Sequence, residues 1–427
     1  MNKTDSIKQL MSMNFTESEK LFEEAQSISP GGVTSERQPS KFIPGKYPIF
    51  LDHGKGSHVW DVDGNEFIDW VCSYGPLVLG HCNENVDNAV IENISNGFCF
   101  TLFHPVHNTL IKKLLEIMPW FEMAKILTSG SDATAAAVRI ARIYTGKDKV
   151  IRWGYHGWHD WSYGGAGTDK VPYGVPDSIK KDILTFEYNN LDSLEDVFKN
   201  NKGKVACVIM QPFEASKELP NGGFLEGVKK IAHENDAVLI FDEIRTGFRV
   251  SMGGAEQYYN IFPDMACFSK AMANGYPISA VVGKKDIMLP SQQTRISATF
   301  FPNTFPMVAA LATIKEIEVR SGIEFMWKQG KKIVNGFEKL INDYGIEAKM
   351  IGMPVIPMLK LTYKSDETNN KCKEIFFGEM IERGIFLHPN HHWFLSLAHT
   401  DEDVDDTINA AEFSFTKLKK ALNFNIK

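Results

Sequence analysis

The 427-residue sequence has only six cysteines, and none of them form a CxxC pair. Scattered cysteines in a chain of this length argue against a disulfide framework and against a structural zinc site. The sequence also lacks an apolar run of membrane-spanning length, and its polar N-terminus has no hydrophobic core of a secretory signal. We therefore expect a cytoplasmic protein.

A strong charge of one sign, low-complexity tracts and internal repeats are absent as well. The formal net charge of −7 argues against a nucleic acid or an anionic membrane as the main partner. With 43% hydrophobic and 23% charged residues, the composition is typical of a folded globular protein. Because the chain is too long for one core of ordinary size, it predicts a large domain and a smaller one.

Short apolar runs alternate with helical segments through the middle of the chain. The runs 205–210, 237–241 and 265–268 are fully apolar or nearly so, and the segment 132–144 has a helical pattern. Apolar runs that alternate with helices predict parallel strands in an α/β layer structure.

The two ends of the chain have other patterns. Residues 15–27 favour a short helix, and residues 49–70 alternate apolar and polar side chains around Asp63-Gly64, which is typical of a hairpin turn. After 306 a helical stretch runs through 319, and we place a domain boundary at its start.

Two of the apolar runs end in residues suited to cofactor chemistry. Asp242 and Glu243 follow the run 237–241, and open α/β sheets bind ligands at the carboxyl ends of their strands. A carboxylate there can hold a protonated ring nitrogen, although a metal-binding or merely solvated acidic strand end fits the same pattern. Lys270 follows the run 265–268, and a partly buried lysine amine can attack an aldehyde. The alternative is an ordinary lysine at a strand end.

Two loops complete this set. Ser129-Gly130-Ser131 precedes the helical segment 132–144, so its amides can bind an anion, or the segment is a simple helix cap. Tyr155 can stack on a flat heterocycle, or it is a loop aromatic that covers the core. His156 and His159 form an HxxH pair without a third ligand, so we expect no metal site.

Further motifs lie in a fixed order along most of the chain. They are Pro30-Gly31-Gly32-Val33, Val59-Trp60-Asp61-Val62-Asp63-Gly64-Asn65, Gly80-His81, Ser129-Gly130-Ser131, Tyr155-His156-Gly157, Phe241-Asp242-Glu243, Thr246-Gly247-Phe248-Arg249, Ser269-Lys270 and Ala398-His399-Thr400-Asp401-Glu402-Asp403. This ordered set resembles the class III, fold-type I aminotransferases that depend on pyridoxal 5′-phosphate (PLP), and among them the glutamate-1-semialdehyde aminomutase group.

The resemblance implies an α/β fold-type I transferase. It has a large domain with a mainly parallel seven-stranded sheet and a smaller α+β domain. Residues 1–75 contribute to the small domain, 76–306 form the PLP-binding domain, and 307–427 form the C-terminal small domain. The resemblance also implies a homodimer with the active site at the subunit interface.

The same resemblance assigns roles to individual residues. Lys270 carries PLP as a Schiff base and shuttles protons, and Asp242 pairs with the pyridine nitrogen. Tyr155 stacks on one face of the ring and Ile244 lies against the other, while Glu243 is a structural partner. The remaining cofactor contacts are Ser129, Gly130 and Ser131 at the phosphate, His156, and Thr299 reaching the phosphate from the neighbouring subunit.

The sequence departs from the family pattern where a substrate carboxylate binds. Gln211 stands where many relatives have a glutamate that pairs with a substrate-gating arginine, and no arginine lies near His391 and His392. The usual binding of glutamate's α-carboxylate therefore needs a substitute, for which Arg37 and Arg245 are candidates. Arg245 has the alternative of pairing with a nearby carboxylate. His391, His392 and Trp393 suit a sugar-like or other polar aldehyde, or the three histidines His388, His391 and His392 form a surface cluster.

The sequence therefore predicts an aminotransferase that moves an amino group from a donor, with L-glutamate as the candidate, to an aldehyde or ketone. A sugar-acid aldehyde is the candidate acceptor. One alternative is an intramolecular aminomutase, which the aromatic and proline-rich segment 299–306 disfavours. Another is a PLP-fold protein without turnover, which the presence of Lys270 and Asp242 disfavours. A third, a zinc protein built on the histidines, is weaker.

Overall fold

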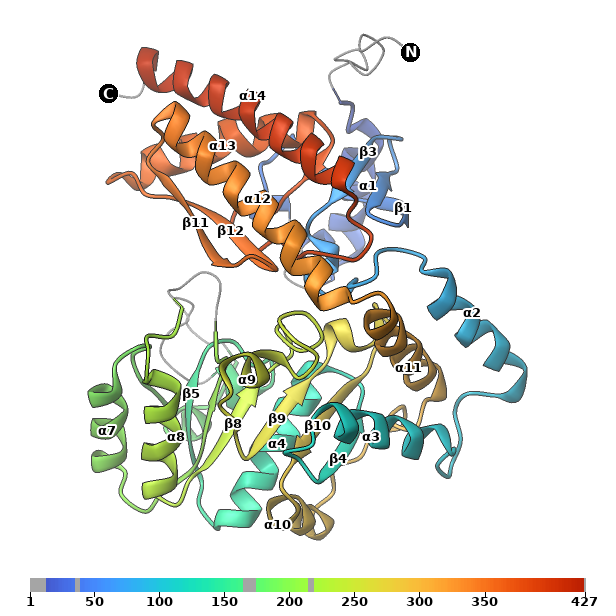
Figure 1. Cartoon of the computed structure of the whole chain (residues 1–427), viewed down its shortest axis with the longest axis vertical. Helices are drawn as coiled ribbons and strands as arrows, with labels where there is room; N and C mark the ends of the chain where they lie inside the picture. Colours follow the sequence, from blue (N-terminus) through green and yellow to red (C-terminus); the bar gives the residue numbers. More distant parts are fainter. Residues whose placement is uncertain (1–12, 35–38, 164–173, 214–218, 426–427) are drawn as a thin grey trace. The chain divides into compact units, whose positions relative to one another are not determined.

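The computed structural model describes residues 13–34, 39–163, 174–213 and 219–425. The chain divides into two compact units, which Figure 1 shows in the colours of the sequence. The larger unit contains Gly75–Leu79 and Asn83–Trp327, and the smaller unit contains Met1–Tyr74, Gly80–Cys82 and Lys328–Lys427.

The larger unit ends at Trp327, whereas the sequence predicted a domain boundary at 306. The reason lies in helix α11 (Thr304–Val319), which packs against α2 (Glu84–Asn93) and α3 (Val106–Ile117) of the larger unit. At the start of α11 the Thr304 amide donates to the Phe98 carbonyl over 2.9 Å, which fixes this end of the helix.

The larger unit is built on a seven-stranded sheet with the order β4-β10-β9-β8-β7-β5-β6. The pairs from β6 to β9 are parallel, and β10 is antiparallel to both of its neighbours. This confirms the predicted mainly parallel seven-stranded sheet. The strands are β4 (Met123–Leu127), β5 (Lys149–Trp153), β6 (Ile183–Thr185), β7 (Val205–Met210), β8 (Val238–Asp242), β9 (Met265–Phe268) and β10 (Ser279–Gly283).

Helices cover both faces of this sheet, which explains why its central strands are apolar throughout. Cys207 and Ile209 of β7 lie in one core cluster with the buried face of α4 (Gly130–Thr145). The alternating residues Val208 and Met210 lie in a second cluster with α7 and α8 on the opposite face (Figure 1). The other helices of this unit are α5 (Asp160–Tyr163), α6 (Asp177–Lys180), α7 (Leu191–Asn200), α8 (Phe224–Glu234), α9 (Gly254–Tyr259) and α10 (Lys285–Met288).

The smaller unit combines a four-stranded sheet of order β1-β2-β3-β13 with the two-stranded sheet β11-β12. The predicted hairpin is confirmed by the antiparallel strands β2 and β3. Gly64 turns between them with a φ of 84°, a backbone conformation that glycine adopts without strain. The elements are α1 (Thr16–Ile28), β1 (Leu51–Lys55), β2 (His58–Asp61), β3 (Glu66–Asp69), α12 (Gly322–Tyr344), β11 (Ala348–Met353), β12 (Ile356–Leu361), α13 (Asp366–Glu382), β13 (Ile385–Phe386) and α14 (Asp401–Asn425).

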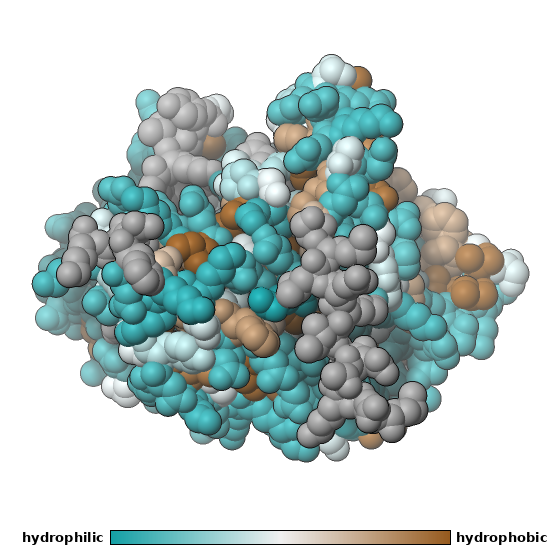
Figure 2. All heavy atoms as spheres, turned by 90° about the horizontal axis from the view of Figure 1, so that it is seen from above, coloured by the Kyte–Doolittle hydropathy of each residue, from teal (hydrophilic) through white to brown (hydrophobic). Residues whose placement is uncertain are grey.

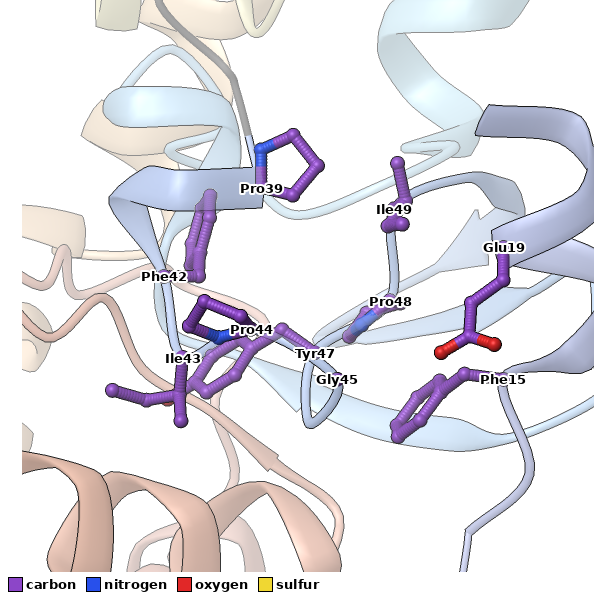
Figure 3. Close-up of a pocket in the computed structure, with 10 residues that line it drawn as sticks. All are labelled: Phe15, Glu19, Pro39, Phe42, Ile43, Pro44, Gly45, Tyr47, Pro48 and Ile49. Atoms are coloured by element: carbon purple, nitrogen blue, oxygen red, sulfur yellow. The ribbon is translucent and has the colours of Figure 1, made fainter. Parts of the chain in front are cut away.

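A cavity of about 30 Å³ lies in the smaller unit (Figure 3). That volume accommodates about one water molecule, so the cavity is too small for a substrate. Its walls are mostly apolar, with Glu19 as the charged side chain, and are formed by Phe15, Glu19, Pro39, Phe42, Ile43, Pro44, Gly45, Tyr47, Pro48 and Ile49.

The surface in Figure 2 is largely hydrophilic and is interrupted by small hydrophobic groups. Among the described residues, none of the helices combines the length and the hydropathy that a membrane-spanning helix requires.

Candidate functional site

The amino end of helix α4 forms one side of the candidate site. Ser129 caps the helix: its hydroxyl accepts from the Asp132 amide over 3.2 Å, and the Asp132 carboxylate accepts from the Ser129 amide over 2.8 Å. Gly130 and Ser131 occupy the first turn, where helix amides have no partner within the helix. These amides and the positive end of the helix dipole can hold a phosphate.

Two glycines allow the neighbouring segments to approach this helix end closely. A Cβ atom on Gly130 would lie 2.8 Å from Cδ1 of Ile244, and a Cβ on Gly157 would lie 2.2 Å from the Ser131 hydroxyl. Gly157 also has a φ of 100°. The structure therefore brings Ile244 close to Gly130, although Ile244 lies more than a hundred residues later in the sequence.

Residues 154–157 form a turn after β5 that carries Tyr155 and His156. The Tyr155 side chain is 50% exposed, whereas His156 is buried. The Thr134 hydroxyl of α4 donates to the His156 carbonyl over 2.7 Å, and Nε2 of Gln211 donates to the Tyr155 carbonyl over 3.1 Å. The turn is thus attached to α4 and to the end of β7.

His156 also connects this turn to Asp242. Its Nδ1 lies 2.7 Å from Oδ2 of Asp242, and its Nε2 lies 3.0 Å from the Trp153 carbonyl. A carbonyl only accepts, so Nε2 is the donor to Trp153, while Nδ1 and the carboxylate share one hydrogen between them. Asp242 is 2% exposed and also accepts from the Ile244 amide over 3.1 Å. A buried carboxylate held in this way fits a protonated ring nitrogen.

Lys270 follows β9, the parallel neighbour of β8, so Asp242 and Lys270 emerge at the same carboxyl edge of the sheet. Lys270 is partly buried and has a φ of 45°, a left-handed conformation that side chains larger than glycine adopt at a cost. The preceding Ser269 hydroxyl donates to the Ile278 carbonyl over 2.7 Å and ties the strand end to the segment before β10.

The other predicted residues lie elsewhere or outside the description. Thr299 is exposed, and Arg245 is partly buried three residues after Asp242. Arg37 falls outside the described residues. His391 and His392 belong to the smaller unit.

The histidine segment is packed within the smaller unit rather than spread over its surface. His391 makes an edge-on contact with Tyr74 at 5.0 Å between ring centroids, and His392 is buried. Burial, aided by Lys41, lowers the pKa of the nearby His388 to about 4. Among the residues that the structure describes, no group of three or more His, Cys, Asp or Glu side chains is placed to hold a metal ion.

Glu243 points to a different set of partners from Asp242. Its carboxylate accepts from the Thr246 hydroxyl and from the amides of Ala255 and Glu256, over 2.7 and 2.8 Å. A Cβ on Gly254 would lie 2.2 Å from this carboxylate, so the chain approaches it closely. Glu243 therefore anchors the start of α9. Burial raises the pKa of Glu243 to about 7.

A second buried carboxyl group, Glu256, stands beside Glu243. Its Oε1 accepts from the Trp120 indole over 2.9 Å, and its Oε2 is buried with no hydrogen-bond partner among the described residues. Burial and the charge of Glu243 raise the pKa of Glu256 well above its ordinary value.

Sequence patterns did not reveal several of these groups. Thr134 and Glu256 read as ordinary helical residues, and Ser279, whose hydroxyl donates to the Ser129 carbonyl over 2.7 Å, reads as the start of a strand. In the sequence, Gln211 differs from the family pattern only in replacing a glutamate that many relatives have. Its hydrogen bond to the Tyr155 carbonyl depends on the neighbouring strands β5 and β7, which no local pattern reports.

The residues present fit the expected PLP. A helix end with free amides, a buried carboxylate and a strand-end lysine meet at one edge of the sheet, and Gly130 and Gly157 allow the neighbouring segments to approach that helix end closely. The helix amides can therefore bind a phosphate, the carboxylate a ring nitrogen and the lysine an aldehyde.

Comparisons with known proteins agree with this arrangement. The model of the aminotransferase class-III family matches residues 43–411. The chain is 43% identical over 418 residues to a 3-aminobutyryl-CoA aminotransferase of Cloacimonas acidaminovorans (strain Evry), covering 96% of this chain and 99% of that protein. It is 36% identical over 427 residues to glutamate-1-semialdehyde 2,1-aminomutase 1 of Bacillus cereus (strain G9842), covering 95% and 99%.

Among solved structures, the fold is similar to that of the FumI protein of Sphingopyxis sp. MTA144 in its PLP internal aldimine form. The TM-score is 0.89 at 27% identity, and the match covers 96% of this chain and 98% of the other. A transaminase with PLP bound has a TM-score of 0.88 at 22% identity, which adds support for the fold alone.

Proposed function

Since the chain belongs to the class-III aminotransferase family, whose cofactor is PLP, we propose that its amino donor is a 3-aminoacyl thioester. The amino group and the hydrogen on C3 pass to C2 of a 2-oxo acid such as 2-oxoglutarate. The products are a 3-oxoacyl thioester and the amino acid, here L-glutamate. The observation that carries this proposal is the 43% identity, over nearly all of both chains, to a 3-aminobutyryl-CoA aminotransferase.

Two features of the sequence and structure support a donor without a carboxylate on its amine-bearing carbon. At the end of β7 the chain has the neutral Gln211, and its amide is engaged with the Tyr155 carbonyl. The segment 388–393, which contains His391 and His392, has no arginine. A 3-aminoacyl thioester presents an uncharged carbonyl two carbons from the amine carbon, so it does not require a buried cation there.

The residue roles follow from the site geometry and are part of the proposal. PLP, when bound, supplies the electron sink. Lys270 would hold it through Nζ, and the same amine, once the substrate amine has replaced it at the cofactor, would move the proton at the substrate carbon. Asp242, held by His156, pairs with the ring nitrogen and keeps it protonated. Tyr155 and Ile244 lie on opposite faces of the ring.

The phosphate and the 2-oxo acid need further groups. In the proposal the amides at Gly130 and Ser131, with the Ser129 cap behind them, bind the phosphate, and Thr299 of a second copy completes its shell. Arg245 or Arg37 binds a carboxylate of the 2-oxo acid, because this substrate, unlike the thioester, carries a charge that needs a cation.

A homodimer with the site at its interface belongs to the same proposal. Several large apolar side chains of the larger unit are more than half exposed, and such side chains are typical of protein interfaces. They are Ile91, Ile94, Leu102, Phe103 and Phe300. A groove of about 550 Å³ between α2 and α11 adds Ala89, Val308 and Leu311 to this apolar surface. Light scattering of the purified protein measures whether two chains associate.

The substrate is tested by coupled product assays on the purified protein with PLP. With 2-oxoglutarate present, 3-aminobutyryl-CoA should yield glutamate, while free 3-aminobutyrate should yield much less. Equal rates with both compounds would show that the thioester is not recognised.

Two other substrates complete the same experiment. Glutamate with a sugar-acid aldehyde tests the acceptor that the histidine segment suggested. Glutamate-1-semialdehyde alone tests an intramolecular mutase, which needs no separate donor. Turnover of either one, without turnover of the thioester, would replace the proposed donor.

A further inference from the structure

The turn 154–157 is held in place by side chains from three different elements. Thr134 of α4 donates to the His156 carbonyl, and Asp242 of β8 holds the His156 ring. Gln211, directly after β7, donates to the Tyr155 carbonyl. Two of these contacts hold His156, and the contact from Gln211 holds the backbone of Tyr155.

Gln211 is fixed in one orientation. Its backbone amide donates to the Trp153 carbonyl over 3.2 Å, and its side-chain Nε2 donates to the Tyr155 carbonyl over 3.1 Å. The amide oxygen cannot exchange places with Nε2, because two acceptors would then face each other. On its other side a Cβ on Gly154, which has a φ of 97°, would lie 2.9 Å from Oε1. The side-chain amide is therefore confined between residue 154 and the Tyr155 backbone.

This arrangement is not the one that would be most stable. Gln211 is 4% exposed, and its Oε1 is buried with no hydrogen-bond partner among the described residues. A buried polar atom without a partner lowers the stability of the folded state, and an apolar side chain of the same shape avoids that cost. What the glutamine side chain provides, and an apolar one would lack, is the hydrogen bond to the Tyr155 carbonyl.

We propose that Gln211 is a positioning residue that fixes Tyr155 against the cofactor. The Tyr155 ring is half exposed, and the hydrogen bond from Gln211 fixes the backbone from which this ring projects. This inference rests on the proposed cofactor-facing role of Tyr155. In many relatives a glutamate at this position pairs with a substrate-gating arginine. In this chain the neutral amide of Gln211 would instead hold the backbone of Tyr155.

The test compares Gln211→Glu and Gln211→Met with the wild-type holoenzyme. Glu places an oxygen opposite the Tyr155 carbonyl in place of the donor, and Met keeps the length of the side chain without either polar atom. Gln257→Glu is the matched control, because Gln257 is exposed and uses its oxygen, which accepts from the Gly253 amide and which glutamate retains. Three quantities are measured: PLP affinity, the visible circular dichroism of bound PLP, and the thermal midpoint of the PLP-free protein.

We expect Gln211→Met to weaken PLP binding by about fivefold, the factor that corresponds to one ordinary hydrogen bond. Gln211→Glu should weaken it further, and both variants should change the visible circular dichroism. The thermal midpoint of PLP-free Gln211→Met should be unchanged or higher, and the control should match wild type throughout.

Each other outcome overturns a distinct statement. Wild-type PLP affinity and dichroism in both variants would overturn the positioning role. A lower thermal midpoint in Gln211→Met, or loss of folding in both variants, would make Gln211 a structural residue and overturn it as well. If the wild-type protein itself bound no PLP, the proposed function would fail, whatever the variants did.

Discussion

The buried pair Glu243 and Glu256 makes the stability of the protein depend on pH in a direction that the structure fixes. Both carboxyl groups lie where burial disfavours the ionised form, so the pKa of each is raised from an ordinary value of 4.5. The informative perturbation is Glu256→Gln. Glutamine keeps the oxygen that accepts from the Trp120 indole, and it replaces the buried Oε2, which has no partner among the described residues.

The magnitude follows from counting protons. Above pH 4.5 the unfolded chain has released the Glu256 proton, whereas the folded protein retains it, so stability falls as the pH rises. Each retained proton costs about 1.4 kcal/mol per pH unit. Glu243 adds the same slope between pH 4.5 and its folded pKa of about 7, above which both states are ionised. Glu256→Gln should therefore remove about 1.4 kcal/mol per pH unit from the slope across this window.

The assay is urea denaturation of wild type and variant at several pH values between about 5 and 8. Because a chain with two units need not unfold in one step, the result is the difference in the free energy of unfolding between the two proteins at each pH. Glu338→Gln, an exposed residue of α12, is the matched control. Infrared spectroscopy adds a local measurement: the carbonyl stretch of a protonated carboxylic acid should be present in wild type at neutral pH and weaker in Glu256→Gln. Parallel stability curves for variant and wild type would refute the assignment of a retained proton to Glu256.

Three further predictions concern the candidate site. Lys270→Ala should abolish the visible absorbance band of lysine-bound PLP and lower turnover by several orders of magnitude. Absorbance spectra and steady-state rates measure the two effects. A retained band would show that Lys270 is not the residue that binds PLP covalently. His156→Phe leaves the buried Asp242 side chain without its partner at 2.7 Å and should cost about 3 kcal/mol of stability. Denaturation measures this loss against a smaller one in His156→Gln, and equal stability of His156→Phe and wild type would contradict a stabilising contact between His156 and Asp242. Gly157→Ala places a Cβ 2.2 Å from the Ser131 hydroxyl, at a residue with a φ of 100°. The strain of about 2 kcal/mol acts on the amino end of α4, where the phosphate is proposed to bind, so PLP binding measured by equilibrium dialysis should weaken at least about tenfold. Unchanged affinity would mean that the turn 154–157 can move without affecting the phosphate site.

The central strands could be predicted from the sequence because both of their faces are buried. Residues 205–210 and 265–268 are apolar without interruption, and they form β7 and β9 with the predicted bounds. The helix predicted at 132–144 is α4 at Gly130–Thr145, and its capping residue Ser129 is the same residue that precedes the candidate phosphate site. In these elements the residues that determine the local structure also determine how the element packs, so the sequence alone predicts both.

The domain boundary depended on packing that a local pattern cannot report. Helix α11 is apolar on most of its sides, so its sequence does not say which unit it joins. Its partners α2 and α3 lie some two hundred residues earlier in the chain. For the same reason, the partner of the Gln211 amide and the buried position of Glu256 became visible only once β5, β7 and α9 were placed.

The neighbouring carboxylates at the end of β8 show how the fold resolves what the sequence left open. Asp242 and Glu243 are consecutive, so on an extended backbone their side chains project to opposite sides. Asp242 meets the His156 ring and the Ile244 amide, and Glu243 meets the Thr246 hydroxyl and the start of α9. The first set places the carboxylate against a ring nitrogen with which it shares a hydrogen. The second set consumes both oxygens in holding a turn. Of the two, Asp242 is therefore the carboxylate suited to a protonated ring nitrogen, and Glu243 the one that fixes the chain behind it.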